Sequence, residues 1–326
     1  MSEISLIEAI TQALRYEMKK DDSIVLFGED IGINGGVFRA TDGLCNEFGK
    51  DRVLDTPLAE SMIAGIAIGM STFGLKPIAE FQFMGFVYPA LDQIINHAAR
   101  MRNRTRGRLH CPIVFRAPFG GGIHAPEHHS ESTEAIFSHI PGLRVVIPSS
   151  PKRAYGLLLA AIRNPDPIIF LEPKRIYRAG KQTVLNDGKT LDLDKCSTLK
   201  EGNDVTLISW GASIKETLTA SLELENEGIS AEVIDLVSIK PIDIDTILNS
   251  IEKTGRCVII HEAAKTCGIG AEISALIAEK GLMHLLAPIK RITGFDTVMP
   301  YFKLENYYIP SVPKIIKLTK EIMEYE

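Results

Sequence analysis

A single acidic residue, Glu60, opens a stretch that is otherwise almost entirely apolar and runs on to Met70. Thr56 is a suitable N-cap for a helix here, and Pro57 is a suitable first helical residue. In that register a capping box would need Glu or Gln where Ala59 stands, so Glu60 is not explained as a cap. A carboxyl among apolar side chains can exchange a proton with a ring nitrogen. Glu60 is therefore a candidate catalytic acid, with stabilisation of the helix dipole as the alternative.

Three histidines, His124, His128 and His129, lie close together in a segment that also contains glycine and proline. Imidazole changes its charge near neutral pH, so a loop histidine can transfer protons. A zinc site would need a further ligand and a helical His-Glu-x-x-His spacing, which Pro126 disfavours. We expect no metal on these histidines, and a surface role is the alternative to catalysis for each.

The composition excludes several classes of protein. The chain has 326 residues, 45% hydrophobic and 24% charged, with a net charge of −5. These values are ordinary for about two globular domains and give no reason to expect a nucleic-acid partner. Five cysteines without a Cys-x-x-Cys favour a reducing, cytoplasmic location. The longest apolar stretch, Ile63–Met70, is too short to cross a membrane, and the acidic N-terminal region is unlike a targeting peptide.

Short β-branched runs alternate with helix-length segments in the first half of the chain. This alternation predicts an α/β domain with a mostly parallel sheet and helices on both faces. The expected strands are 24–27, 77–81, 112–115, 144–147 and 168–171, and the expected helices are 61–71, 86–104, 133–138 and 152–163. Ligands of such sheets collect at the carboxyl ends of the strands. Glu29, Gln82 and the glycine-rich run 117–130 follow three of these strands and are the first places to expect a site.

A polar segment, 179–203, interrupts the alternation and is expected to be a linker with short hairpin strands. The alternation then resumes. The expected strands are 204–209, 231–235, 256–261 and 289–292, and the expected helices are 213–227, 244–252, 269–280 and 312–324. The sequence thus predicts two α/β domains, at 1–180 and 204–326, joined by a linker at 181–203.

Several motifs occur in the order found in a known family. The segment Thr56–Gly69 resembles the pyrimidine-binding domain of thiamine-dependent enzymes. The resemblance covers nearly the whole chain and continues through Glu80–Ile94, Arg116–Gly122, His128–Ser132, Pro141–Pro148 and Phe170–Pro173. Together these motifs resemble the β subunits of the dehydrogenase component of 2-oxo acid dehydrogenase complexes. The second domain then resembles the transketolase-type C-terminal domain, which mainly serves assembly.

The resemblance implies roles for individual residues. The acid matching Glu60 hydrogen-bonds N1′ of the aminopyrimidine of thiamine diphosphate and favours the imino tautomer, which deprotonates the thiazolium. Leu58, Gln82 and Phe86 match positions that contact the ring, and the aromatic residue packs on its face. His129 matches the histidine that assists acyl transfer to the lipoyl group.

The resemblance also implies ions and a partner chain. The family binds potassium through backbone carbonyls at positions near those of Ile113, Ala161, Asn164 and Asp166. The chain lacks the Gly-Asp-Gly…Asn element that holds Mg²⁺ and the diphosphate in thiamine enzymes. Thiamine diphosphate is then shared with a separate α subunit, which holds the Mg²⁺, in an assembly of two α and two β chains.

The implied activity needs that α subunit. It is decarboxylation of a 2-oxo acid, with pyruvate expected, and reductive acylation of lipoyl-lysine on an acyltransferase core bound through the core's subunit-binding domain. The run 119–127 is most similar to bacterial pyruvate enzymes, whereas 88–93 is nearer the branched-chain enzymes. A branched-chain or acetoin dehydrogenase therefore stays open. The C-terminal half of a split transketolase and a catalytically silent scaffold are further alternatives.

Overall fold

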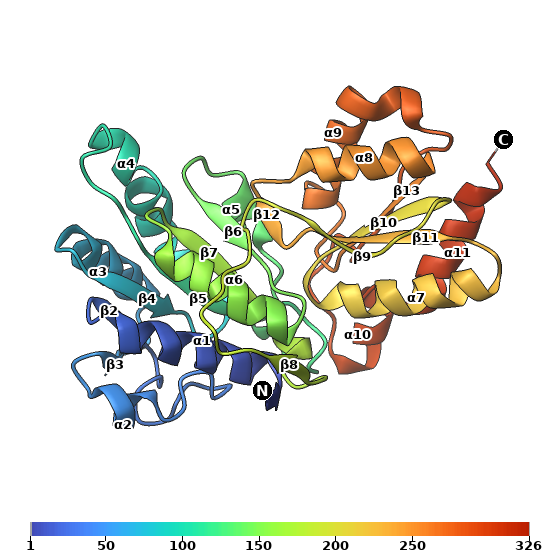
Figure 1. Cartoon of the computed structure of the whole chain (residues 1–326). Coiled ribbons are helices and arrows are strands. Elements are labelled where there is room, and N and C mark those ends of the chain that lie inside the picture. The colour runs from blue at the N-terminus through green and yellow to red at the C-terminus, as the bar shows by residue number, and fades with distance from the viewer. Residues whose placement is uncertain (1, 326) are drawn as a thin grey trace. The chain divides into compact units, whose positions relative to one another are not determined.

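The computed structural model describes residues 2–325 and divides the chain into two compact units (Figure 1). Unit 1 contains the described residues up to Phe119 together with Ile136–Leu193. Unit 2 contains Gly120–Ala135 and the residues from Asp194 onwards. The segment Gly120–Ala135 thus belongs to the second unit, although it lies within the first half of the sequence. Both units combine a largely parallel sheet with helices, so the predicted α/β class is confirmed.

Six strands of unit 1 form a parallel sheet in the order β6–β7–β5–β4–β2–β3. Every residue of β2, β5 and β7 is buried, as expected for strands covered on both faces. The strand bounds are β2 Ile24–Gly28, β3 Val53–Asp55, β4 Lys76–Glu80, β5 Val114–Phe119, β6 Arg144–Val146 and β7 Ile168–Pro173.

Two long helices of unit 1, α1 and α6, pack against each other and against β2 and β7, and α3 packs on β4 (Figure 1). The sequence analysis did not predict α1. Its start is fixed by a capping box in which the Ser5 backbone N–H donates to Glu8 Oε2 at 2.7 Å. The helix bounds in this part of the chain are α1 Leu6–Lys20, α2 Leu44–Phe48, α3 Glu60–Thr72, α4 Met101–Arg104, α5 Glu134–Ser138 and α6 Pro151–Arg163.

The single helix predicted over 86–104 is wrong. The segment contains parts of two 3₁₀ turns, η1 (Met84–Phe86) and η2 (Tyr88–Ala90), followed by the π-helix η3 (Gln93–Ala98) and the short α4. Pro89 has no N–H to donate, and in a helix its ring would clash with the carbonyl four residues earlier. Further along, the Ala99 N–H reaches back to the Ile94 carbonyl at 2.9 Å, which is a π turn.

Unit 2 contains a five-stranded sheet in the order β14–β13–β10–β11–β9, parallel except for β9. Alternate residues of β10, β11 and β13 join residues of α7 and α11 in one apolar cluster, which places these two helices on the same face. The strand bounds are β9 Ser197–Lys200, β10 Val205–Ser209, β11 Ala231–Asp235, β12 Ser238–Lys240, β13 Cys257–Ile260 and β14 Lys290–Ile292. The helix bounds are α7 Ile214–Asn226, α8 Ile244–Thr254, α9 Ile269–Gly281, α10 Phe302–Tyr308 and α11 Val312–Met323.

The hairpin expected in the polar segment 179–203 is also wrong. Strand β8 (Gln182–Val184) pairs antiparallel with β1 (Ser2–Ile4), and β9 pairs antiparallel with β11. Each strand therefore satisfies its backbone groups on an edge supplied by a distant part of the sequence. Between them, the Gly188 N–H donates to the Tyr155 hydroxyl at 3.0 Å, which holds this stretch on α6.

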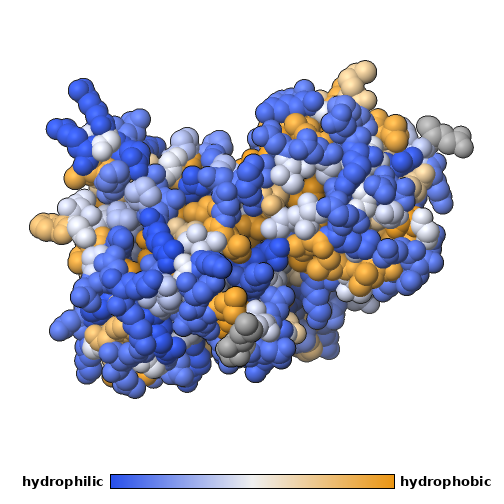
Figure 2. Space-filling model, in the orientation of Figure 1, coloured by the Kyte–Doolittle hydropathy of each residue, from blue (hydrophilic) through white to orange (hydrophobic). Residues whose placement is uncertain are grey.

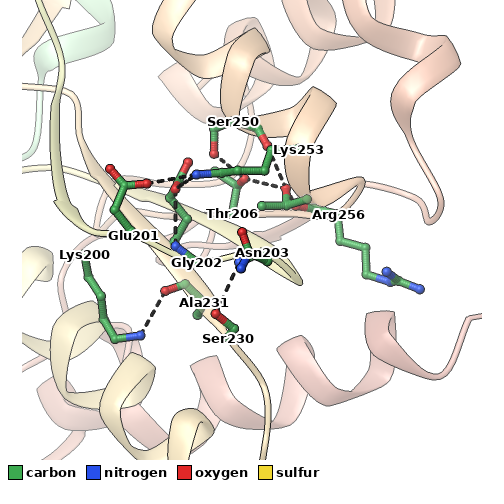
Figure 3. A network of polar contacts seen from close by, with 12 residues as sticks. Lys200, Glu201, Gly202, Asn203, Thr206, Ser230, Ala231, Ser250, Lys253 and Arg256 are labelled. Atoms are coloured by element: carbon green, nitrogen blue, oxygen red, sulfur yellow. Dashed lines mark hydrogen bonds and ion pairs between the residues drawn. The ribbon is translucent and has the colours of Figure 1, made fainter.

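A network of ion pairs fastens the end of β9 to the rest of unit 2 (Figure 3). Lys253 on α8 lies 2.9 Å from the Glu201 carboxylate and also pairs with Glu232 on β11. Glu232 in turn accepts a hydrogen bond from the Gly202 N–H at 3.3 Å. The charged groups compensate one another, so we interpret this network as structural.

The face drawn in Figure 2 is mainly hydrophilic, with separate hydrophobic areas. Within residues 2–325, no helix is both long enough and apolar enough to cross a membrane.

Candidate active site

Glu60 is the first residue of α3, and Ala59 stands at the N-cap without a capping side chain. The expected start at Thr56 and Pro57 is wrong, because the Thr56 N–H donates to the Gly28 carbonyl at 2.9 Å and extends the pairing of β3 with β2. Glu60 is buried, with 7% of its surface exposed. Among residues 2–325, no side chain or backbone group forms a hydrogen bond or ion pair with its carboxylate. A buried carboxylate in this state is suited to receive a donor from a ligand.

A second carboxylate, Glu29, shares the electrostatic environment of Glu60. It follows β2 directly, is half-buried, and its Oε2 is buried without a hydrogen-bond partner in the described chain. Burial raises the pKa of Glu29, and the charges of Asp30 and Glu60 raise it further. The charge of Glu60 therefore disfavours the ionised form of Glu29. The position of Glu29 after a strand was predicted, but its coupling to Glu60 was not.

The three residues predicted to contact a ring follow β3 or β4. Leu58 is 58% exposed and lies just before α3. Gln82 and Phe86 follow β4 and are half-buried, and the Phe86 ring packs edge-on against that of Phe83 with centroids 5.6 Å apart. Because β4, β2 and β3 are adjacent and parallel, the residues after them share one edge of the sheet with Glu29.

A second group of buried acids at this edge is fully paired. The Arg116 guanidinium donates to both carboxylate oxygens of Glu172, at 2.6 and 3.1 Å, and to Glu80 at 2.8 Å. The Tyr177 hydroxyl donates to Glu172 at 2.6 Å. Burial lowers the pKa of Arg116, but the two carboxylates outweigh it and raise that pKa above its ordinary value. This group ties β4, β5 and β7 together.

His129 lies in unit 2, at the end of the short 3₁₀ turn η4 (Glu127–His129). It is half-buried, whereas His124 and His128 are exposed. Residues on both sides of it, including Glu127 and Ser130, line a cavity of about 210 Å³ in unit 2 together with Met299. No group of three His, Cys, Asp or Glu side chains within residues 2–325 is arranged to hold a metal ion.

Sequence reasoning missed two acids that hold the segment carrying His129. Glu262 and Glu305 are buried in unit 2 and accept hydrogen bonds from the glycine-rich run that precedes the histidine. No local motif marks either residue, because their partners lie more than a hundred positions away in the sequence.

The four residues predicted near a potassium ion lie at the end of α6 and the starts of β5 and β7. The Asn164 N–H donates to the Ala161 carbonyl at 3.2 Å, and the Ile168 N–H donates to the Ile113 carbonyl at 2.9 Å. Each of these carbonyl oxygens keeps a second lone pair. The side chain of Asp166 is paired with Arg102 at 2.6 Å, which leaves backbone oxygens as the available ligands.

Two family models match the chain. The model described as "Transketolase, pyrimidine binding domain" matches residues 2–180, and the model described as "Transketolase, C-terminal domain" matches residues 194–315. A solved structure entitled "Split gene transketolase, inactive beta4 tetramer" has a TM-score of 0.82 at 23% identity and covers 99% of both chains. At that identity the likeness establishes the fold alone, and the predicted transketolase-type domains are confirmed.

Full-length relatives carry a more specific name. "Pyruvate dehydrogenase E1 component subunit beta" of Acholeplasma laidlawii is 51% identical over 322 residues, which cover 99% of this chain and 98% of the relative. Proteins of the same name from Bacillus subtilis (strain 168) and Staphylococcus epidermidis (strain ATCC 12228) are 46% identical over 325 residues and covered completely. The predicted family is confirmed, and bacterial pyruvate enzymes are favoured over the branched-chain, acetoin and split-transketolase alternatives. With two transketolase-type domains and relatives of this identity along its whole length, the chain belongs to the family of pyruvate dehydrogenase E1 component β subunits.

Proposed function

We propose that this chain is the β subunit of a thiamine diphosphate-dependent pyruvate dehydrogenase. The observation that carries the proposal is the Glu60 carboxylate, which belongs to a residue only 7% exposed and stands at a helix N-terminus without a hydrogen-bond donor from the described chain. An aminopyrimidine nitrogen that carries a proton supplies the missing donor, so the residues present fit the cofactor. When bound, thiamine diphosphate supplies the carbanion chemistry of decarboxylation.

The residues around Glu60 bind and orient the ring in this proposal. Glu60 would accept a hydrogen bond from the ring at N1′, and its carboxylate stands at a helix N-terminus, which favours negative charge. Phe86 offers an aromatic face, while Leu58 and Gln82 offer an apolar and a polar contact. Glu29 places a second carboxylate in the electrostatic environment of Glu60.

The chain shares the cofactor with an α subunit that supplies the ligands for Mg²⁺ and the diphosphate. Support comes from the missing Gly-Asp-Gly…Asn element and from the absence of a metal-binding group of side chains within residues 2–325. The assembly contains two α and two β chains, acts in the cytoplasm, and docks on the subunit-binding domain of a lipoyl acyltransferase core.

Reconstitution tests this division of labour. The β chain is purified alone and as a complex with its α subunit, and binding of thiamine diphosphate with Mg²⁺ is measured by titration. We expect tight binding only by the complex, and pyruvate turned over faster than branched 2-oxo acids or acetoin. Tight binding by the β chain alone would contradict the shared site, and a preference for another substrate would contradict the pyruvate assignment.

His129 assists acyl transfer to the lipoyl group in this proposal. It is the least exposed of the three neighbouring histidines and lies beside a cavity of about 210 Å³. We expect His129→Ala in the complex to lower the rate of lipoyl acylation by about 100-fold or more, because general acid–base catalysis contributes on that scale. The exposed His128→Ala is the matched control and should keep the wild-type rate. Equal rates for both variants would remove His129 from the mechanism.

A potassium ion binds at the end of α6, through the backbone carbonyls of Ile113, Ala161, Asn164 and Asp166. The helix C-terminus is a favourable place for a cation, and two of these carbonyls have the lone pair for it. Replacing K⁺ by Na⁺ should lower the melting temperature of the complex. An unchanged melting temperature would argue against the ion.

A further inference from the structure

The segment that carries His129 is closed into a loop by one buried oxygen. Glu262 Oε1 accepts a hydrogen bond from the Gly121 N–H at 3.1 Å and another from the Ser132 hydroxyl at 3.0 Å. These two donors stand on either side of His129, so a single acceptor ties both ends of the loop. Glu262 is only 5% exposed, and the other oxygen of its carboxylate is buried without a hydrogen bond to the described chain.

A second buried carboxylate holds the first half of the same loop. Glu305, on α10, accepts from the Gly122 N–H through Oε1 at 2.6 Å and from the His124 N–H through Oε2 at 3.1 Å. The His124 ring nitrogen Nε2 also lies 3.5 Å from this carboxylate. Both oxygens of Glu305 are therefore used, whereas Glu262 uses only one.

Close packing makes these contacts specific to glycine. A Cβ added to Gly120 would lie 1.9 Å from Glu262 Oε1, and one added to Gly121 would lie 2.3 Å from the Met299 side chain. Gly120 also has φ of +80°, which disfavours other residues. The glycine run thus packs directly against Glu262 and Glu305.

We propose that Glu262 and Glu305 are positioning residues that set the conformation of the loop Gly121–Ser132 and so place His129 for acyl transfer. The placement of His129 rests on the proposed function, whereas the anchoring of the loop does not. Two such anchors hold a glycine-rich segment that would otherwise sample many conformations.

Glu262 accepts hydrogen bonds through one carboxylate oxygen and Glu305 through both, so an amide substitution should affect the two residues differently. In Glu262→Gln the amide oxygen can still accept both hydrogen bonds, so this variant should keep the loop anchored. In Glu305→Gln the amide nitrogen must face one of two backbone N–H groups, so one anchor is lost. Glu262→Ala and Glu305→Gln should therefore loosen the loop, and Glu262→Gln should not.

The test uses the assembled complex of α and β chains. Hydrogen–deuterium exchange of residues 120–135 reports the loop, and lipoyl acylation is compared with pyruvate oxidation by an artificial electron acceptor. We expect Glu262→Ala to speed exchange in this segment and to lower acylation about 10- to 100-fold more than acceptor-dependent oxidation, because small misplacements act on this scale. Glu262→Gln should restore both values.

Glu232→Ala is the matched control, because Glu232 is also a buried acid of unit 2 that accepts from a glycine N–H, that of Gly202. It should reduce stability without changing exchange in residues 120–135 or the ratio of the two activities. Wild-type exchange in Glu262→Ala, or faster exchange in Glu262→Gln, would overturn the anchoring. If exchange changes as expected but His129→Ala acylates lipoyl normally, the anchoring stands and the proposed role of His129 fails.

Discussion

Two groups of acids lie at the carboxyl ends of neighbouring strands in unit 1, and they differ in their partners. Glu80 and Glu172 lie at this edge, and the Arg116 guanidinium donates hydrogen bonds of 2.6–3.1 Å to both. Glu60 and Glu29 lie at the same edge without hydrogen bonds to their carboxylates from the described chain. We call Glu80 and Glu172, whose carboxylates are hydrogen-bonded within the chain, the saturated group. We call Glu60 and Glu29, whose carboxylates have no such hydrogen bonds, the unsaturated group.

The difference separates a structural from a functional use of the same side chain. A buried carboxylate that keeps an arginine and a tyrosine beside it has no capacity left for a ligand. A carboxylate without a donor from the protein keeps its oxygens available to a ligand. The comparison therefore predicts that changes in the first group act on stability and that changes in the second act on activity.

Among these variants, Glu60→Gln, in the unsaturated group, should have the largest effect on activity. The amide cannot exchange a proton with a ring nitrogen, so we expect turnover of the assembled complex to fall by about 100- to 10,000-fold. The melting temperature without cofactor should stay within a few degrees of the wild type, because no hydrogen bond of the described chain is lost. Turnover near the wild-type rate would remove Glu60 from the mechanism.

Arg116→Met removes the cation of the saturated group and should have the next largest effect, a loss of stability. It leaves Glu80 and Glu172 buried without their cation, which destabilises proteins by about 3–5 kcal/mol. Urea unfolding of the complex at fixed protein concentration measures the change. The surface variant Arg15→Met removes an exposed pair with Glu47 and should lower stability by less than about 1 kcal/mol. Similar losses for the two variants would contradict the assignment of a structural role to Arg116.

Much of the fold follows from local patterns. Most strands of the central sheets and helices such as α3, α6, α7 and α8 lie within one or two residues of their predicted bounds. Strand β5 ends four residues later than predicted, and β3 was not predicted. Helix α1 was missed, although its capping box and apolar spacing were present in the sequence. The segment 86–104 was mistaken for one helix because its apolar spacing hides a proline and a π turn. The partners of β8 and β9 could not be predicted, since both lie far away in the sequence.

Residues of the candidate site could be predicted where a neighbouring motif or strand in the sequence marks them. Glu60 follows a recognisable motif, and Glu29 follows a strand. Glu262 and Glu305 could not be found in this way, because they act through backbone N–H groups 141 and 183 positions away. A glycine run can be recognised in a sequence, but the residues that pack against it in the structure cannot.

Glu134 tests an intermediate case, a buried acid with a weak neutral donor. The Trp210 indole N–H reaches it at 3.4 Å, and burial, with the charge of Glu262 adding, raises its pKa from 4.5 to about 7. The folded state therefore keeps a proton that the unfolded state has lost, and stability falls as the pH rises from about 4.5 to about 7. The fall amounts to about 3 kcal/mol at most. Glu134→Gln keeps the acceptor for Trp210 and should remove most of this fall in urea titrations between pH 5 and 8. An unchanged pH dependence would show that Glu134 is ionised throughout.

The coupling between Glu29 and Glu60 should give the smallest effect and the sharpest test of the unsaturated group. The raised pKa of Glu29 means that its ionised form is disfavoured in the folded state, so stability is lost as the pH rises through that pKa. Glu29→Gln should therefore make the complex without cofactor slightly more stable at pH 8 than the wild type. In a Glu60→Gln background the gain should shrink, because the repulsion from Glu60 is already absent. A double-mutant cycle of unfolding free energies measures this difference. Strictly additive effects would show that the two carboxylates do not interact, although they lie at the same edge of the sheet.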